Sequence, residues 1–233
     1  MDLNEVLNEL ESYADERTKN THKKHGAQEP LFGVKVGDLK KILKKTKKNH
    51  ELSQALFDTG NSDAMYLAGL MADEKKISKE QLQRWVKKAN WYYLSEYTVP
   101  WITAESNYGF ELGLEWIRSD EETVASAGWS TLANYASINN SLDLETYASL
   151  LEEIPDQIQN AQNRVKYTMN GFVIAVGCYI PELTAKSKEI AKKIGKVDVF
   201  MGGTSCKVPL AIDYIKKVEA RNSIGKKRKM ARC

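Results

Sequence analysis

The residues whose side chains stand out chemically in this chain of 233 residues are aromatic. The five tryptophans are Trp85, Trp91, Trp101, Trp116 and Trp129. Trp91 is followed directly by Tyr92 and Tyr93. Flat aromatic faces stack on bases and attract cations. The same rings at helical spacing also pack between helices, and we expect most of these tryptophans to lie in a core.

Cationic side chains that could contact phosphates gather in three segments. Residues 40–48 place lysines around a helix whose apolar positions are Leu39, Ile42 and Leu43. Residues 163–172 combine basic, amide and aromatic groups, and residues 202–209 resemble an anion-holding loop before a helix that begins at Pro209. The alternatives are a solvated first turn on a buried helix for 163–172 and a simple helix-entry turn for 202–209.

Metal, disulfide and cofactor chemistry find no support in the spacing of ligand-type residues. Cys178, Cys206 and Cys233 are odd in number and form no CxxC pair, so we expect free thiols. The histidines are His22, His25 and His50, which lie in lysine-rich surroundings without ligand spacing. We therefore predict no metal site and no cofactor, and expect these histidines to contact solvent or phosphate.

The elements that position these residues are predicted to be helices from end to end. Capping boxes are expected at residues 2–5, 78–81 and 119–122, and a further helix is expected to begin at Pro155. Residues 18–30 are polar and indicate a loop or a frayed helix end. No segment alternates long enough to predict a sheet. Successive helices joined by short loops are compatible with two architectures, a compact bundle and an α-solenoid. The sequence pattern alone does not decide between them.

Composition is that of a globular protein, with 42% hydrophobic and 28% charged residues and a formal net charge of +3. We predict one domain over residues 1–221 and a basic C-terminal tail over 222–233, which should be solvated. No stretch approaches the roughly 18 apolar residues of a membrane span. The first residues also lack the features of a signal peptide, so we predict a cytoplasmic protein without membrane contact.

Several motifs together resemble the AlkC/AlkD-like DNA alkylation repair family. Gly33-Val34-Lys35-Val36-Gly37-Asp38-Leu39-Lys40-Lys41-Ile42 is similar to an early signature of the type GVKVxxLKKIxK. The helix at residues 67–72, the Asn90-Trp91 pair and the Trp116-Ile117 segment follow in the same order as in the family. The resemblance covers most of the chain up to about residue 180, and the order of the motifs carries it.

The resemblance implies a right-handed α-α superhelix of HEAT-like repeats, an all-α solenoid whose basic concave face holds duplex DNA. Active members of the family release cationic bases such as 3-methyladenine and 7-methylguanine. Such a base is already a good leaving group, so the enzyme mainly stabilises positive charge that develops on the sugar. A carboxylate supplies that field, and tryptophan faces hold the cationic nucleotide.

The catalytic positions that the resemblance implies differ in this chain. Active members carry Asp four residues after the tryptophan that Trp91 matches, and Ser95 stands there. Glu96 is adjacent, but it would point elsewhere unless the helix is locally rewound, because one residue turns a helix by about 100°. The family's arginine position falls on Ser126 or Ala125. Arg118 is no obvious substitute, and Glu105 is a second candidate for a displaced acid.

We therefore predict a DNA-binding protein related to the alkylation repair glycosylases that lacks their catalytic acid and arginine. The predicted base-cleft residues are Trp91, Ser95, Tyr92, Ser126, Trp129 and Asn170. The predicted DNA-backbone contacts are Lys35, Lys40, Lys44, Arg164, Lys166 and Lys207. The expected partner is double-stranded DNA, with or without alkylation, bound by a monomer. Two alternatives stay open: an active N-glycosylase with a displaced carboxylate such as Glu96, and a helical-repeat adaptor for protein or RNA.

Overall fold

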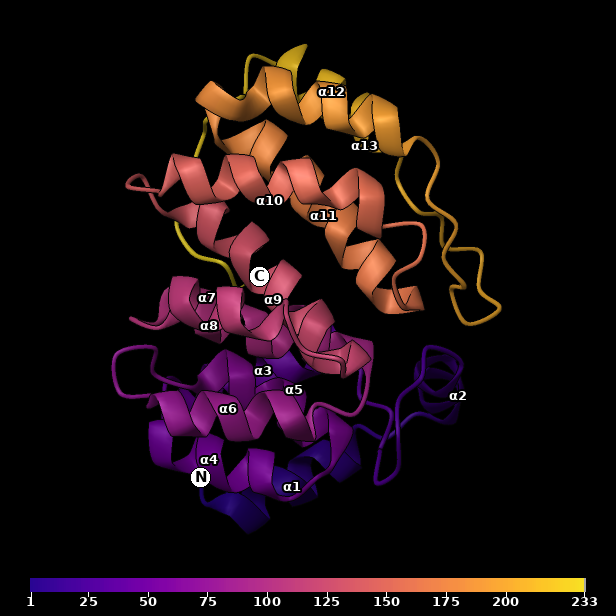
Figure 1. Ribbon diagram of the computed structural model, residues 1–233. Coiled ribbons are helices and arrows are strands. Elements are labelled where there is room, and N and C mark those ends of the chain that lie inside the picture. Colours follow the sequence, from indigo (N-terminus) through magenta and orange to yellow (C-terminus); the bar gives the residue numbers. More distant parts are fainter. Residues whose placement is uncertain (233) are drawn as a thin grey trace.

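The computed structural model describes residues 1–232 and shows a stack of helices, with no strand in that range (Figure 1). The first half comprises α1 (Leu3–Ser12), α2 (Glu16–Lys24), α3 (Val36–Thr46), α4 (His50–Asp58), α5 (Ser62–Met71), α6 (Lys79–Lys88), the π-helix η1 (Tyr93–Thr98) and α7 (Val99–Glu105). The second half comprises α8 (Gly109–Trp116), α9 (Glu122–Ile138), α10 (Leu144–Gln157), α11 (Asn163–Tyr179), the 3₁₀ turn η2 (Pro181–Leu183), α12 (Thr184–Ile194) and α13 (Ala211–Glu219).

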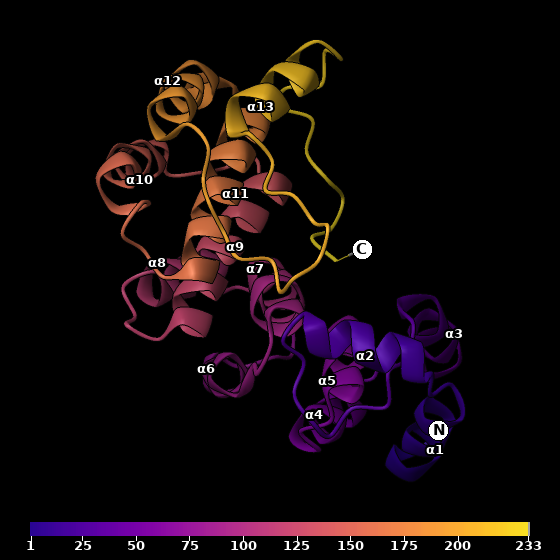
Figure 2. The same ribbon diagram turned by 90° about the vertical axis from the view of Figure 1, so that its right-hand side faces the viewer.

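The helices form two layers that curve along the stack. Figure 2 shows α4, α6, α8, α10 and α12 along the outer side and α5, α7, α9, α11 and α13 along the inner side. Outer and inner helices pack in pairs, such as α4 with α5 and α8 with α9, and α11 packs against both α9 and α13. α1 and α3 pack against α5 at the N-terminal end. Because each pair buries its apolar faces against the next, the stack is a solenoid rather than a closed bundle.

The core consists of two apolar clusters that meet at α9. The first cluster runs from Val6 to Ala127 and also includes Ala231, and the second runs from Ala125 to Ile215. Every residue of α5 is buried, so this helix forms the centre of the first cluster. Phe57 and Trp85 stack there with ring centroids 4.0 Å apart. The prediction that most tryptophans lie in the core is confirmed, since all five are at most 6% exposed.

Helix starts test the capping predictions. The capping boxes of Asp2 with Glu5 and of Ser78 with Gln81 are confirmed. The box at residues 119–122 is wrong, because α9 has Glu121 as its N-cap and no side-chain cap bond. Pro155 lies inside α10 rather than at a helix start, and α13 begins at Ala211 instead of Pro209.

The expected loop at residues 18–30 is wrong in its first part, because α2 forms there. Asp15 caps this helix by accepting bonds from the Thr18 amide and hydroxyl, at 2.7 and 2.6 Å. The helix contains no buried residue and therefore shows no apolar stripe. Figure 1 shows it at the right-hand edge of the stack, beyond the ends of the other helices. A polar helix of this kind is invisible to a search for apolar periodicity.

The C-terminal segment is packed against the body, so the expectation of a solvated tail is wrong. We call residues 223–232 the C-terminal strap. Its Lys227 ammonium donates to the Ala136 and Tyr179 carbonyls at 2.7 and 2.8 Å, which places it at the ends of α9 and α11. Arg232 donates to Glu105 Oε2 at 2.7 Å and to the Ala72 carbonyl at 2.7 Å. The strap thus joins the second half of the stack to α5 and α7.

Candidate functional site

The segment that contains Trp91 and Glu96 leaves ordinary helical geometry. Residues 93–98 form the π-helix η1, whose bonds connect residues five apart and widen the turn. Pro100, near the start of α7, has no amide hydrogen to donate back into this turn. An ordinary α-helix would point Glu96 elsewhere. The wider π turn changes its direction, and Glu96 contacts Arg164 of α11.

Glu96 forms a buried ion pair with Arg164 from α11. The guanidinium Nε and Nη2 donate to the two carboxylate oxygens at 2.5 and 2.6 Å. The Glu96 side chain is 1% exposed and the Arg164 side chain is 14% exposed. Burial raises the pKa of the Glu96 carboxyl, to about 7, while the Arg164 guanidinium opposes the rise. Both oxygens of this carboxylate are therefore committed to one cation within the protein.

Arg164 also lies over two tyrosine rings. Its guanidinium carbon is 4.4 Å from the ring centre of Tyr92 and 4.5 Å from that of Tyr167. A planar cation over two ring faces and beside a carboxylate occupies a complete cation-binding cage. The cage holds an internal cation, the guanidinium of Arg164.

The aromatic row Trp91–Tyr93 is covered by α2 through two histidines. His22 lies 5.2 Å from the Trp91 ring centre, and Trp91 stacks on Tyr93 at 4.5 Å. The ring of His25 is hydrogen-bonded to the Tyr92 hydroxyl. Burial lowers the pKa of both histidines, and for His25 the nearby Arg164 lowers it further. His22 and His25 therefore contact the aromatic row, where the sequence favoured contact with solvent or phosphate.

A cavity of about 310 Å³ lies beside this cluster. It is lined by Lys23, Lys24, His25, Gly26, Asn90, Trp91, Tyr92, Ser95, Glu122, Thr123, Asn163, Arg164, Phe200, Met201 and Gly202. The loop before α13 closes one side, because the Asn163 amide group exchanges two hydrogen bonds with the backbone of Phe200, at 2.7 and 2.9 Å. A side chain at Gly202 would collide with the Lys24 carbonyl, at 2.1 Å. The cavity thus lies between α2 and a loop far along the chain.

The structure gathers only part of the predicted base cleft. Trp91, Tyr92 and Ser95 line the cavity together. The other three predicted residues, Ser126, Trp129 and Asn170, are at most 3% exposed and lie in the core. Their groups have other partners there: Ser126 donates to the Glu122 carbonyl, Trp129 packs on Phe172, and Asn170 donates to the Pro209 carbonyl.

The predicted backbone-contacting cations are distributed over two parts of the stack. Lys35, Lys40 and Lys44 are exposed on α3 and at its N-terminus, and Lys207 is exposed before α13. Lys166 is half-buried on α11. Arg164 is committed to Glu96 instead of facing solvent. Contact of the lysines with DNA stays a prediction.

Sequence reasoning missed two residues of the site. Glu122, in the first turn of α9, lines the cavity and accepts a bond from the Arg164 amide at 2.8 Å. Tyr167 completes the cage around Arg164. Its position three residues after Arg164, on one face of a helix, is a signal that could have suggested the contact. Nothing in the local sequence connects Glu96 with Arg164, which are 68 positions apart.

The remaining candidate groups add no further chemistry to this cavity. Within residues 1–232 no group of three or more His, Cys, Asp or Glu side chains could hold a metal ion. Cys178 is buried, which raises the pKa of its thiol to about 11, and Cys206 is exposed. Cys233 lies outside the described residues. None of the helices in the described chain has the length and apolarity needed to cross a membrane.

Comparison with solved structures defines the class of protein. One solved chain matches with a TM-score of 0.91 and 38% sequence identity, covering 100% of both chains. It belongs to "a new family of proteins related to the HEAT-like repeat DNA glycosylases with affinity for branched DNA structures". The predicted superhelix of HEAT-like repeats is therefore confirmed.

The family follows from the sequence comparisons. The sequence model described as "DNA alkylation repair enzyme" matches residues 6–186, so the chain belongs to this family. It is 37% identical over 219 residues to the uncharacterized protein Lmo0209 of Listeria monocytogenes, covering 91% of this chain and 95% of that protein. It is 36% identical over 222 residues to Lin0241 of Listeria innocua, covering 93% and 96%. The predicted resemblance is confirmed.

Proposed function

We propose that this protein binds double-stranded DNA as a monomer in the cytoplasm, prefers branched DNA over linear duplex, and lacks the glycosylase activity of the catalytic family members. The preference for branches is transferred from the structural relative, which shares 38% identity over the whole chain. The DNA carries alkylated bases or none, because binding to the backbone does not require the lesion.

One observation carries the non-catalytic part of the proposal. Both oxygens of Glu96, the carboxylate closest in sequence to the family's acid position, accept bonds from Arg164 at 2.5 and 2.6 Å. A carboxylate that stabilises a developing sugar cation must present an oxygen to it. Glu96 is 1% exposed and already neutralised, so it has no field to offer a DNA sugar.

The cage around Arg164 supports the same conclusion. Tyr92, Tyr167 and Glu96 offer the groups that attract a cationic base, two ring faces and a carboxylate. The guanidinium already fills this space. A cationic alkylpurine would have to displace a bidentate ion pair, which is a large cost for a site with so little exposure.

Two assays on the purified protein test the proposal. Binding to a three-way DNA junction and to a linear duplex of equal length is measured at several salt concentrations. We expect tighter binding to the junction and a steep loss of affinity as salt rises, because phosphate contacts release counterions. Absence of salt-sensitive DNA binding would favour the adaptor alternative and overturn the proposal.

Release of methylated purines from alkylated duplex is measured in parallel. We expect none. Release that is lost in Glu96→Gln or Glu122→Gln would overturn the non-catalytic part and establish a displaced acid. Trp91→Phe is the matched control, because it keeps a ring between His22 and Tyr93 and leaves both carboxylates in place.

A further inference from the structure

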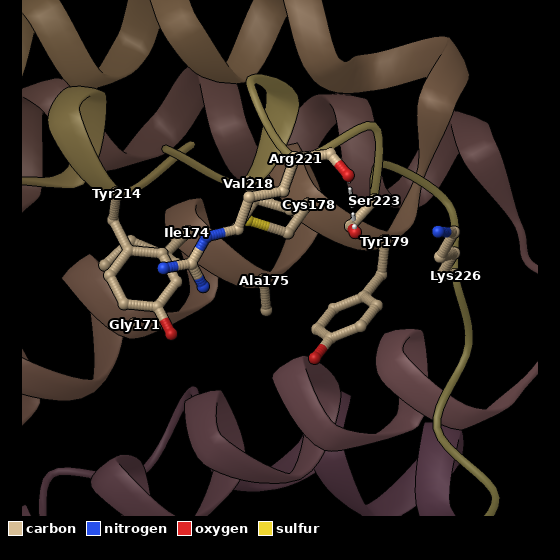
Figure 3. A pocket seen from close by; sticks show the side chains of 10 residues that line it. All are labelled: Gly171, Ile174, Ala175, Cys178, Tyr179, Tyr214, Val218, Arg221, Ser223 and Lys226. Carbon is tan, nitrogen blue, oxygen red and sulfur yellow. Dashed lines mark hydrogen bonds between the residues drawn. The ribbon is translucent and has the colours of Figure 1, made fainter. Parts of the chain in front are cut away.

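A second pocket lies on the inner side of the stack, between α11, α13 and the C-terminal strap. Its volume is about 360 Å³. Figure 3 shows Tyr214 and Tyr179 on opposite sides, with Ala175 between them, the Arg221 side chain next to Tyr214 and Lys226 on the side of Tyr179. Two aromatic rings and two cations from three different segments therefore face one space.

The charge of this pocket is not neutralised from within. No Asp or Glu is among the residues that line it. Arg221 and Lys226 are exposed, and within residues 1–232 neither side chain forms an ion pair. Tyr214 is 48% exposed, so its ring is accessible from this pocket. Unpaired cations beside an exposed ring are complementary to an anionic ligand that also has flat faces.

Gly171 shows that the floor of the pocket is kept open. It lies inside α11, where glycine destabilises a helix relative to alanine. Gly177 in the same helix has a packing reason, since a Cβ there would lie 2.6 Å from Ile215 Cδ1. A Cβ at Gly171 would meet nothing within 4 Å. Packing does not require this glycine, and its visible effect is to leave the inner face of α11 bare.

Gly171 also borders a neighbouring cavity. Gly171 lines both this pocket and the neighbouring cavity, which has a volume of about 320 Å³ and lies towards η1. The lining of the neighbouring cavity includes Tyr97, Trp101 and Tyr167, together with Glu96 of the ion pair. We call the two cavities together the α11 groove. Aromatic rings occur at both ends of it, with Gly171 between them.

We propose that the α11 groove binds an unpaired DNA strand, whose bases stack on Tyr214 and Tyr179 and whose phosphates contact Arg221 and Lys226. This inference rests on the proposed DNA-binding function and gives it a specific ligand class. An unpaired base exposes its ring faces, whereas stacking inside a duplex hides them. A branch point supplies such a strand next to duplex DNA, so the groove accounts for a preference for branched over linear substrates.

The test measures fluorescence anisotropy with three probes: a labelled oligothymidylate, a blunt duplex, and the same duplex carrying a single-stranded branch. We expect Tyr214→Ala to weaken binding of the oligothymidylate and of the branched probe by roughly tenfold, the loss of one stacked base. Binding of the blunt duplex should not change. Arg221→Gln should lower the salt slope for the oligothymidylate by about 0.7, the value for one phosphate contact to a single strand.

Substitutions at Gly171 provide matched variants within one site. Gly171→Ala has open space for its methyl group and should retain binding, while Gly171→Leu should fill the groove and weaken binding of the unpaired strand. Lys192→Gln, at an exposed position of α12 that lines neither cavity, controls for a general loss of positive charge. Melting temperatures of all variants show whether each is folded.

The outcomes separate the two proposals. Absence of binding to any DNA probe overturns the proposed function and this inference with it. Binding of the wild type to duplex and branched DNA, with Tyr214→Ala and Gly171→Leu unchanged on the branched probe, overturns the groove alone. Equal weakening on the blunt and branched probes also overturns it, because the residues would then contact duplex. Selective loss on the probes with an unpaired strand supports it.

Discussion

Arg164 and Arg221 lie on the same inner side of the stack in opposite circumstances. Arg164 is paired with a carboxylate and lies over two tyrosine rings, all supplied by the protein. Arg221 is exposed beside Tyr214 with no acid among the lining residues. The first arrangement resembles a binding site already filled, and the second resembles one that awaits a ligand. The comparison teaches that aromatic and cationic residues indicate a ligand only where their charges are left unpaired.

The largest effect is expected from breaking the filled cage. Glu96→Ala leaves the Arg164 charge buried without its partner, which should lower the free energy of unfolding by about 3–5 kcal/mol. Denaturation by urea measures the change. The double variant Glu96→Leu/Arg164→Met should recover most of the loss, because it removes both charges together. A single variant as stable as the wild type would show that the pair is solvated and the comparison unfounded.

A smaller loss is expected where the strap contacts α7 and the end of α5. Arg232 is 10% exposed and bonds to Glu74, Glu105 and the Ala72 carbonyl. Arg232→Ala should cost about 2–3 kcal/mol, since hydrogen bonds to charged groups are among the stronger ones. Lys229→Ala is the control, because that side chain is exposed. Equal stability of the two variants would mean that the strap contacts contribute nothing.

The docking of α2 on the aromatic row Trp91–Tyr93 should depend on pH. The pKa of His22 and of His25 is lowered from 6.5 when α2 is docked, so the undocked helix binds protons more readily as pH falls below about 6.5. Docking is therefore complete above that pH and weakens in acid. Hydrogen exchange of residues 16–25 at pH 5 and pH 7.5 measures it. The variant His22→Gln/His25→Gln should lose this dependence, and a wild type without it contradicts the prediction.

The smallest change in the free energy of unfolding is an increase, and it is expected at Gly171 in the α11 groove. Gly171→Ala should raise the free energy of unfolding by about 0.5–1 kcal/mol, since alanine favours a helix and its methyl group meets no atom within 4 Å. Gly177→Ala, in the same helix, should be destabilising because Ile215 lies at 2.6 Å. Thermal melts of the two variants make the comparison. A destabilised Gly171→Ala would indicate that this face is packed.

The parts of the fold that the sequence predicts are the local ones. Capping at Asp2 and Ser78, and apolar spacing along most helices, follow from neighbours within one or two turns. The sequence did not predict α2, because this helix has no apolar stripe. It is stabilised by the Asp15 cap and by the contacts of His22 and His25 with an aromatic row far along the chain.

The candidate site was predicted in part for the same reason. Trp91 and Tyr92 are neighbours in sequence and lie together in the cavity. The partner of Glu96 depends on a π turn and on a residue 68 positions away, and neither leaves a local pattern. Trp129 and Asn170 were assigned to the cleft by their chemical type, but burial in the core decides their position. The α11 groove was not predicted, because Tyr214 and Arg221 belong to no recognisable sequence motif.

The C-terminal strap changes how the stack should unfold. In a solenoid each repeat contacts only its neighbours, so terminal repeats can melt before the middle ones. Here Arg232 is bonded to the Ala72 carbonyl, 160 positions away, and Ala231 is part of the first apolar cluster. Opening either half therefore breaks contacts of the other. Both halves are expected to melt in one cooperative transition, and the curvature of the inner side persists until that transition.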